Sequence, residues 1–180
     1  KLEALPLPVL SIPGMSDLVN GSMRIDELQD VKIEDLLGRD PVAPKKKLLH
    51  ANIKGKVVMV TGAGGSIGSE LCRQIIRCEP LTLVLFELSE YALYAIEQEL
   101  KALICNEALE INLVPVMGTV QRQSRLESVM RAFGVHTVYH AAAYKHVPLV
   151  EYNVVEGVRN NVFGTWYAAE AAIKAGVETF

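Results

Sequence analysis

The sequence contains few residues of the kinds that bind metals or form disulfides. It has three cysteines and four histidines among 180 residues, with no CxxC pair and no HExxH spacing. An odd number of cysteines outside such patterns argues against a disulfide framework and against a zinc site. We therefore expect reduced thiols, a cytoplasmic location and no metal site.

The sequence also lacks a long apolar run and an excess of positive charge. No run approaches the roughly 18 apolar residues that a membrane span needs, and no signal peptide is recognisable. The formal net charge is −3, and the one short basic run, 45–47, is typical of a solvated linker. These features predict no contact of this chain with nucleic acid or with a membrane. Because the chain begins at Lys1 rather than Met, a longer parent protein with an upstream anchor, at the cytoplasmic face of the inner membrane, remains an open alternative.

Regular hydrophobic periodicity is missing from the first 50 residues, which hold five of the eight prolines. Residues 22–37 could form one or two short helices, and Pro41 prevents a helix from continuing there because the residue before a proline is pushed out of the α region. We predict that residues 1–50 are a connector from an upstream domain. Residues 51–180 are then the N-terminal part of a nucleotide-binding domain.

Short apolar runs alternate with helical patterns from residue 56 onward. Val57–Val60 is a continuous apolar run, as in a strand buried on both faces. Further strands are expected at 81–86, 111–116 and 137–140, with a fifth beginning at 177–180. Helices are expected from Ser66, from Ser89, from a capping box at 124–127, and across 154–175. This alternation predicts an α/β fold, a Rossmann-type doubly wound parallel sheet that is incomplete at the C-terminus.

A glycine loop lies between the first predicted strand and the first predicted helix. Gly62, Gly65 and Gly68 are spaced three and three, the form found in short-chain dehydrogenases. Gly62 would permit a tight turn, Gly65 would let the backbone approach a pyrophosphate, and Gly68 would allow close helix packing. The N–H groups at the helix start, at Ser66 and Ile67, would bind the anion. A P-loop for ATP is excluded because no Gly-Lys-Ser/Thr follows.

An acidic residue completes the dinucleotide signature. Glu87 ends the second predicted strand and lies 87 − 68 = 19 residues after the last glycine. A carboxylate there can accept hydrogen bonds from the ribose hydroxyls, and it would repel a 2′-phosphate. The sequence therefore favours NAD over NADP. The ends of the next two strands would line the same site, with Thr119 and Val120 at the adenine and with Ala141, Ala142 and Ala143 beside the nicotinamide ribose.

Two longer runs resemble a particular family. The glycine loop within Val60–Gln74 (VTGAGGSIGSELCRQ) resembles extended short-chain dehydrogenases/reductases. Ala141–Glu151 (AAAYKHVPLVE), Val158–Ala169 (VRNNVFGTWYAA) and Phe86–Tyr91 (FELSEY) are similar to the nucleoside-diphosphate-sugar 4,6-dehydratases of bacterial surface polysaccharide, lipopolysaccharide and O-antigen synthesis. Residues 36–42 also look like the connector of the long, membrane-anchored members.

The resemblance implies bound NAD, a UDP-N-acetylhexosamine substrate and a 4-keto-6-deoxy sugar product. It also implies that Lys145 and His146 face the substrate side of the nicotinamide, and that Asn161 is a buried helix residue that braces the catalytic strand. A homo-oligomer is compatible with it.

The family's catalytic Ser/Thr and its Lys-containing acid/base group would lie beyond Phe180, so no catalytic residue is assigned within this chain. The three tyrosines near the site, Tyr139, Tyr144 and Tyr152, are not candidates because none is followed four residues later by Lys. Two alternatives stay open: a nucleotide-sugar 4-epimerase on the same fold, and a non-catalytic NAD-sensing module.

Overall fold

The computed structural model describes residues 10–11, 29–30 and 45–180. The chain divides into two compact units, Lys1–Pro44 and Lys45–Phe180. In the first unit, strand β1 (Leu10–Ser11) pairs antiparallel with β2 (Gln29–Asp30). The predicted short helices across 22–37 are therefore wrong at Gln29 and Asp30, and the rest of that range lies outside the described residues. The connector role of residues 1–50 stays a prediction.

The second unit is built on a parallel sheet of four strands. The strands are β3 (Val57–Thr61), β4 (Thr82–Glu87), β5 (Asn112–Met117) and β6 (Thr137–His140). They lie in the order β5-β4-β3-β6, with every pair parallel. Since successive strands run parallel and a helical segment joins each to the next, the predicted Rossmann-type α/β fold is confirmed.

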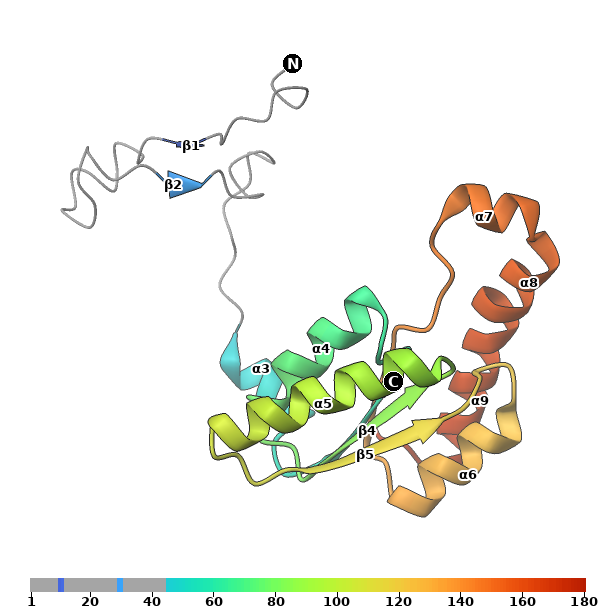
Figure 1. The fold of residues 1–180 in the computed structure, drawn as a ribbon. Coiled ribbons are helices and arrows are strands. Elements are labelled where there is room, and N and C mark those ends of the chain that lie inside the picture. The colour runs from blue at the N-terminus through green and yellow to red at the C-terminus, as the bar shows by residue number, and fades with distance from the viewer. Residues whose placement is uncertain (1–9, 12–28, 31–44) are drawn as a thin grey trace. The chain divides into compact units, whose positions relative to one another are not determined.

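Helices cover both faces of this sheet (Figure 1). On one face, α4 (Ser66–Ile76) and α5 (Glu90–Asn106) bury residues such as Ile76 and Leu100 against alternate strand residues such as Val58. On the other face, α6 (Gln123–Phe133) and α9 (Gly164–Ala175) pack against the intervening strand residues, among them Met59 and Phe86. The central strands β3 and β4 are buried on both sides because each side has its own helix layer.

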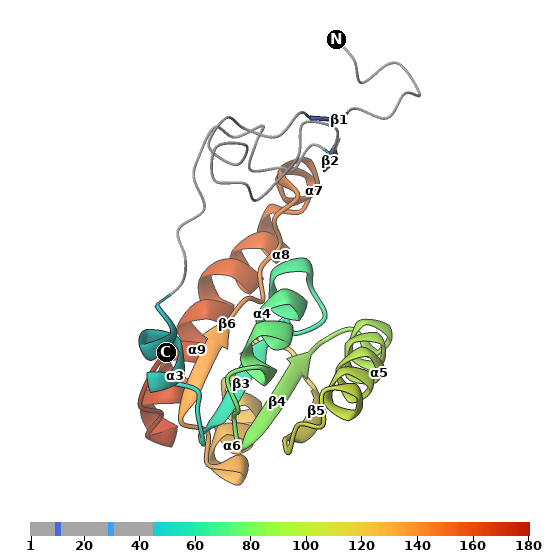
Figure 2. The same cartoon turned by 90° about the vertical axis from the view of Figure 1, so that its left-hand side faces the viewer.

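The short helix α3 (Lys46–Ala51) precedes β3. Helices α7 (Val147–Tyr152) and α8 (Val154–Val158) follow β6 and lie beyond the carboxyl ends of the strands (Figure 2). No helix within residues 45–180 combines the length and the apolar character that crossing a bilayer requires.

Two helix starts were predicted from side-chain caps, and they have different outcomes. The Ser89 side chain accepts a hydrogen bond from the Ala92 N–H, so the predicted cap of α5 is confirmed. The capping box at 124–127 is wrong, because the N-cap of α6 is Arg122, two residues before Ser124, and no side chain caps the helix. The preceding Thr119 hydroxyl accepts from the Gln121 N–H, which forms a turn that places the helix start.

The helical segment predicted across 154–175 contains a wide turn that periodicity did not reveal. Residues Arg159–Phe163 form a π-helix, η1, between α8 and α9. The segment ends as predicted at Gly176, which has a left-handed backbone with φ 75°. Of the predicted fifth strand, the structure contains one parallel bridge, between Thr137 and Thr179.

Candidate cofactor site

The glycine loop connects β3 to α4 at the carboxyl edge of the sheet. Gly62 has a φ of 66°, a left-handed conformation that favours glycine. A Cβ at Gly62 would lie 2.8 Å from the backbone N of Ala142, and one at Gly68 would overlap the Gly62 carbonyl oxygen. The loop, the start of α4 and the segment after β6 therefore approach one another at distances that only glycine permits.

The start of α4 presents unpaired backbone donors. Within residues 45–180, no backbone or side-chain group accepts a hydrogen bond from the N–H of Ser66, Ile67 or Gly68, and the first bond of the helix is from Ser69 N to Gly65 O at 2.8 Å. Gly65 is the N-cap and supplies no side-chain acceptor. The positive end of the helix and three open N–H groups suit an anionic ligand group.

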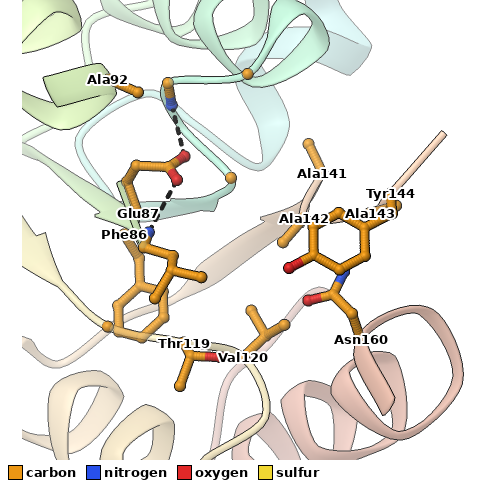
Figure 3. A pocket seen from close by; sticks show the side chains of 15 residues that line it. Phe86, Glu87, Ala92, Thr119, Val120, Ala141, Ala142, Ala143, Tyr144 and Asn160 are labelled. Atoms are coloured by element: carbon orange, nitrogen blue, oxygen red, sulfur yellow. Dashed lines mark hydrogen bonds between the residues drawn. The ribbon is translucent and has the colours of Figure 1, made fainter. Parts of the chain in front are cut away.

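Glu87 holds the glycine loop as well as facing the groove. Its Oε2 accepts from the Gly64 N–H at 3.0 Å, and its Oε1 accepts from the Leu88 N–H at 2.8 Å (Figure 3). The same Oε1 also accepts from the Ser89 N–H at 3.0 Å. A carboxylate has roughly four acceptor positions. Three are used here, so about one acceptor position remains for a ligand hydroxyl.

Gly64 was not among the residues that sequence reasoning selected, although it stands inside the motif. Its N–H fixes the Glu87 carboxylate, and a Cβ at this position would lie 2.6 Å from the Ala92 Cβ. The signal in the sequence that could have pointed to Gly64 was the presence of this additional glycine within the motif. Its contact with α5 depends on tertiary packing and could not be seen in the sequence.

A groove of about 230 Å³ runs along this edge. Figure 3 shows Glu87, Thr119 and Val120 to one side of it and the alanines after β6, with Asn160, to the other. The predicted residues that line it are Gly62, Gly65, Glu87, Thr119, Val120, Ala141, Ala142 and Ala143. Gly64, Phe86, Leu88, Ala92, Gly118, Tyr144 and Asn160 complete the lining.

A second, larger groove of about 630 Å³ continues from the first. It contains the remaining predicted residues, Ser66 and Ile67 at the helix start and Lys145 and His146 in the loop before α7. Gly65, Ala141, Ala143 and Tyr144 line both grooves. The structure thus places every predicted surface residue of the site along one continuous edge, and Gly68 is buried beneath it. Their roles in binding remain a proposal.

The segment between the two grooves is fixed by Asn161, which lies in the π-helical turn. Its Oδ1 accepts from the Tyr144 N–H at 2.8 Å, and its Nδ2 donates to the Tyr144 carbonyl at 2.8 Å. The buried Asn160 donates from Nδ2 to the same Oδ1 at 3.1 Å. Asn161 itself is only partly buried, so it clamps the loop after β6 from the side of the helix.

We expect Asn161→Ala to lower the free energy of unfolding by about 2 kcal/mol, since two hydrogen bonds are lost. Amide hydrogen exchange at Tyr144 should accelerate by about 10-fold, because its N–H loses its acceptor. Denaturant unfolding and exchange followed by NMR measure the two effects. Asn153→Ala is the control, because that side chain makes a single bond, to the Leu149 carbonyl. Unchanged exchange at Tyr144 would show that the clamp does not hold the loop.

His140 ties the end of β3 to the helical layer. The Thr165 hydroxyl donates to the Asn161 carbonyl at 2.8 Å and so accepts from His140 Nε2 at 3.1 Å. His140 Nδ1 then accepts from the Thr61 hydroxyl at 2.8 Å. This arrangement requires a neutral ring, and burial lowers the pKa of His140, which favours that state. Thr61 immediately precedes the glycine loop. The hydrogen bonds from Thr61 through His140 and Thr165 to Asn161 therefore anchor the start of the loop to the helical layer.

Within residues 45–180, no group of three or more His, Cys, Asp or Glu side chains is arranged to hold a metal ion.

Comparison with known proteins places the chain among polysaccharide biosynthesis proteins. The model of the family described as "Polysaccharide biosynthesis protein" matches residues 58–180. The capsular polysaccharide biosynthesis protein CapD of Staphylococcus aureus is 43% identical over 172 residues, which cover 96% of this chain and 28% of that protein. The probable polysaccharide biosynthesis protein EpsC of Bacillus subtilis is 42% identical over 169 residues, covering 94% and 28%.

A more distant relative is a UDP-N-acetylglucosamine 4,6-dehydratase (inverting) of Campylobacter jejuni, which is 29% identical over 126 residues, covering 69% of this chain and 34% of that protein. The chain therefore spans between 28% and 34% of the length of these three relatives.

Solved structures agree on the fold. Pen from Bacillus thuringiensis superposes with a TM-score of 0.62 at 30% identity, covering 70% of this chain and 37% of that one. DesIV, a dTDP-glucose 4,6-dehydratase from Streptomyces venezuelae solved with NAD and TYD bound, gives a TM-score of 0.55 at 26% identity, covering 68% and 37%. With the family match across most of the chain and the resemblance to extended short-chain dehydrogenases confirmed, the chain belongs to the polysaccharide biosynthesis protein family.

Proposed function

We propose that this chain is the NAD-binding part of a nucleotide-sugar 4,6-dehydratase that acts on a UDP-N-acetylhexosamine in surface polysaccharide synthesis. One observation carries the proposal. The open N–H groups at the start of α4 and the Glu87 carboxylate lie along one edge, in two adjoining grooves that share Gly65, where a dinucleotide requires an anion site and a hydroxyl acceptor.

The residues of the groove fit this cofactor. The N–H groups of Ser66, Ile67 and Gly68 would bind the pyrophosphate, and the remaining acceptor position of Glu87 would bind a ribose hydroxyl. Leu88 and Val120 offer apolar surface to the adenine. The small side chains at 141–143 leave room for the second ribose. Bound there, NAD would supply an acceptor for hydride from the sugar.

The second groove would hold the nucleotide sugar. Lys145 and His146 lie at its rim and are exposed, so they can reach an anionic or hydroxylated substrate. The Asn161 clamp on Tyr144 fixes the segment that carries them. A C4 hydroxyl that binds beside this segment would be held near the nicotinamide. The Campylobacter dehydratase and DesIV support the choice of reaction.

Cofactor selectivity tests the groove. We expect NAD to bind about 10-fold or more tightly than NADP, because the Glu87 carboxylate would repel a 2′-phosphate and a tenfold ratio needs only about 1.4 kcal/mol. Glu87→Gln should reduce this ratio. Calorimetric titration of both cofactors measures it. Glu90→Gln is the matched control, because it removes the same charge from an exposed residue that does not line the groove. Equal affinities for the two cofactors in the unmodified chain would disprove this role of Glu87.

The product separates the dehydratase from the two alternatives. A 4,6-dehydratase releases a 4-keto-6-deoxy sugar that is lighter than the substrate by one water. A 4-epimerase leaves the mass unchanged, and an NAD-sensing module yields no product. Mass spectrometry of a reaction with the longer parent protein therefore identifies the dehydratase, and chromatography that separates the two C4 epimers distinguishes the epimerase from the sensing module.

A further inference from the structure

A hollow of about 590 Å³ adjoins the outer end of the cofactor groove and shares Leu88, Gly118 and Thr119 with it, while its other lining residues have no role in the function proposed above. It is formed where β4 and β5 end and where α6 begins. Its lining residues are Leu88, Met117, Gly118, Thr119, Arg122, Ser124, Arg125 and Ser128. Two guanidinium groups and three hydroxyl groups therefore surround it, and no acidic side chain lines it.

The two arginines differ from the other arginines of the unit. Arg73, Arg77, Arg131 and Arg159 each pair with a glutamate. Within residues 45–180, neither Arg122 nor Arg125 has a carboxylate partner. The nearby acids are already engaged, since Glu127 pairs with Arg131 and Glu87 accepts three backbone N–H groups. The positive charge of the hollow is therefore not neutralised by the protein.

This arrangement is unfavourable for the fold alone. Arg122 and Arg125 stand at the N-cap and in the first turn of α6, where the helix is positive and acidic residues are preferred. No acidic residue occupies that turn, and no side chain caps it. Two cations beside each other at a positive helix end oppose stability. A local arrangement that opposes stability with no compensating contact points to a functional requirement.

We propose that this hollow binds a phosphoryl group of a small-molecule ligand, with Arg122 and Arg125 as the charged contacts and the Thr119, Ser124 and Ser128 hydroxyls beside them. Guanidinium groups bind phosphate oxygens in pairs of parallel hydrogen bonds, which suits this composition. The volume exceeds that of one phosphate, so a larger phosphorylated molecule fits. Two sources share this chemistry: a separate phosphorylated ligand, and the 2′-phosphate of NADP. Because Glu87 would repel the latter, we assign the site to a separate ligand.

Inorganic pyrophosphate is the probe, titrated by calorimetry at constant ionic strength. The Gly65→Val chain is used beside the unmodified chain, because its glycine loop is obstructed and pyrophosphate can then report on the hollow alone. In the Gly65→Val background, we expect Arg122→Gln/Arg125→Gln to weaken pyrophosphate binding by at least about 10-fold, since charge-assisted bonds are lost. In the unmodified chain the same change should remove one of two binding events. Arg77→Gln/Lys101→Gln removes the same charge from exposed, paired residues and should bind as the unmodified chain does.

A second measurement is the melting temperature, which is compared first without ligand and then with pyrophosphate. In phosphate-free buffer, the Arg122→Gln/Arg125→Gln chain should melt at a higher temperature than the unmodified chain, because two cations no longer oppose the helix end. In the Gly65→Val background, pyrophosphate should then raise the melting temperature of the chain that keeps both arginines and not that of the chain that lacks them.

Each outcome decides the assignment. Equal pyrophosphate binding with and without the two arginines in the Gly65→Val background overturns the anion site, as does the absence of saturable binding in that background. NADP binding that depends on the two arginines, with no such effect on pyrophosphate, overturns the separate ligand in favour of the cofactor's 2′-phosphate. Loss of NAD binding in Gly65→Val with pyrophosphate binding retained supports the hollow and the cofactor groove independently.

Discussion

Gly65→Val is expected to weaken NAD binding by about 100-fold or more while the protein stays folded. Gly65 lines both grooves and stands directly before the open N–H groups of α4. Its φ of −74° and ψ of 169° are extended backbone that valine adopts without strain. A Cβ there would meet one neighbour, the Gly62 carbonyl oxygen, at 3.3 Å. The branched side chain would therefore project into the position proposed for the pyrophosphate, at a cost that exceeds about 2.8 kcal/mol.

Two further variants separate loss of binding from loss of fold. Gly65→Ala removes the same N-cap glycine, which costs about 1 kcal/mol of stability, and it adds less bulk, so its NAD affinity should lie between those of the unmodified chain and the valine variant. Gly68→Ala should instead lower the melting temperature, since its Cβ would overlap the Gly62 carbonyl oxygen. Calorimetry and thermal unfolding measure the two quantities. A folded Gly65→Val chain with unchanged NAD affinity would refute the assignment of the loop.

The sheet and its edge residues were predictable because they depend on local patterns. The continuous apolar run at Val57–Val60 indicated a strand covered on both faces, and the structure has a helix layer on each. The spacing of Gly62 and Gly68 indicated a close approach, and a side chain at either position would collide with backbone. The constraint at Gly68 acts within a few residues, whereas Gly62 approaches Ala142, 142 − 62 = 80 residues away, and its local part is the left-handed backbone of the turn.

The finer parts of the site depend on contacts between distant residues. The bond from Gly64 to Glu87 joins residues 23 apart, and the Asn161 clamp reaches back 17 residues to Tyr144. Neither residue pair leaves a periodic signal. The expectation that Asn161 is buried was wrong. Asn161 is only partly buried, and the buried residue is its neighbour Asn160. The π-helical turn decides which of two adjacent asparagines reaches Tyr144, and hydrophobic spacing does not reveal such turns.

The 180-residue chain, produced alone, is expected to form no detectable 4-keto product from a UDP-N-acetylhexosamine and NAD. Turnover needs the hydride acceptor, a proton acceptor at the sugar and a pocket that aligns the two. A positioned general base contributes typically about 10²–10⁴-fold, and alignment of the reactants contributes a further large term. The groove described here offers a place for the hydride acceptor. The resemblance places the acid/base group after Phe180, and the capsular relatives are more than three times as long as this chain, which covers 28% of their length.

A longer chain that includes the following strand and the sugar-binding domain should therefore convert the substrate, whereas the 180-residue chain should bind NAD without turnover. Both are incubated with the UDP-sugar and NAD, and the product is followed by mass spectrometry. Calorimetry on the same samples verifies that the short chain binds the cofactor, so that a lack of product reflects missing catalytic groups. If the short chain does form product, a proton acceptor must lie within it. Tyr144, Lys145 and His146 at the second groove would then be the first residues to substitute.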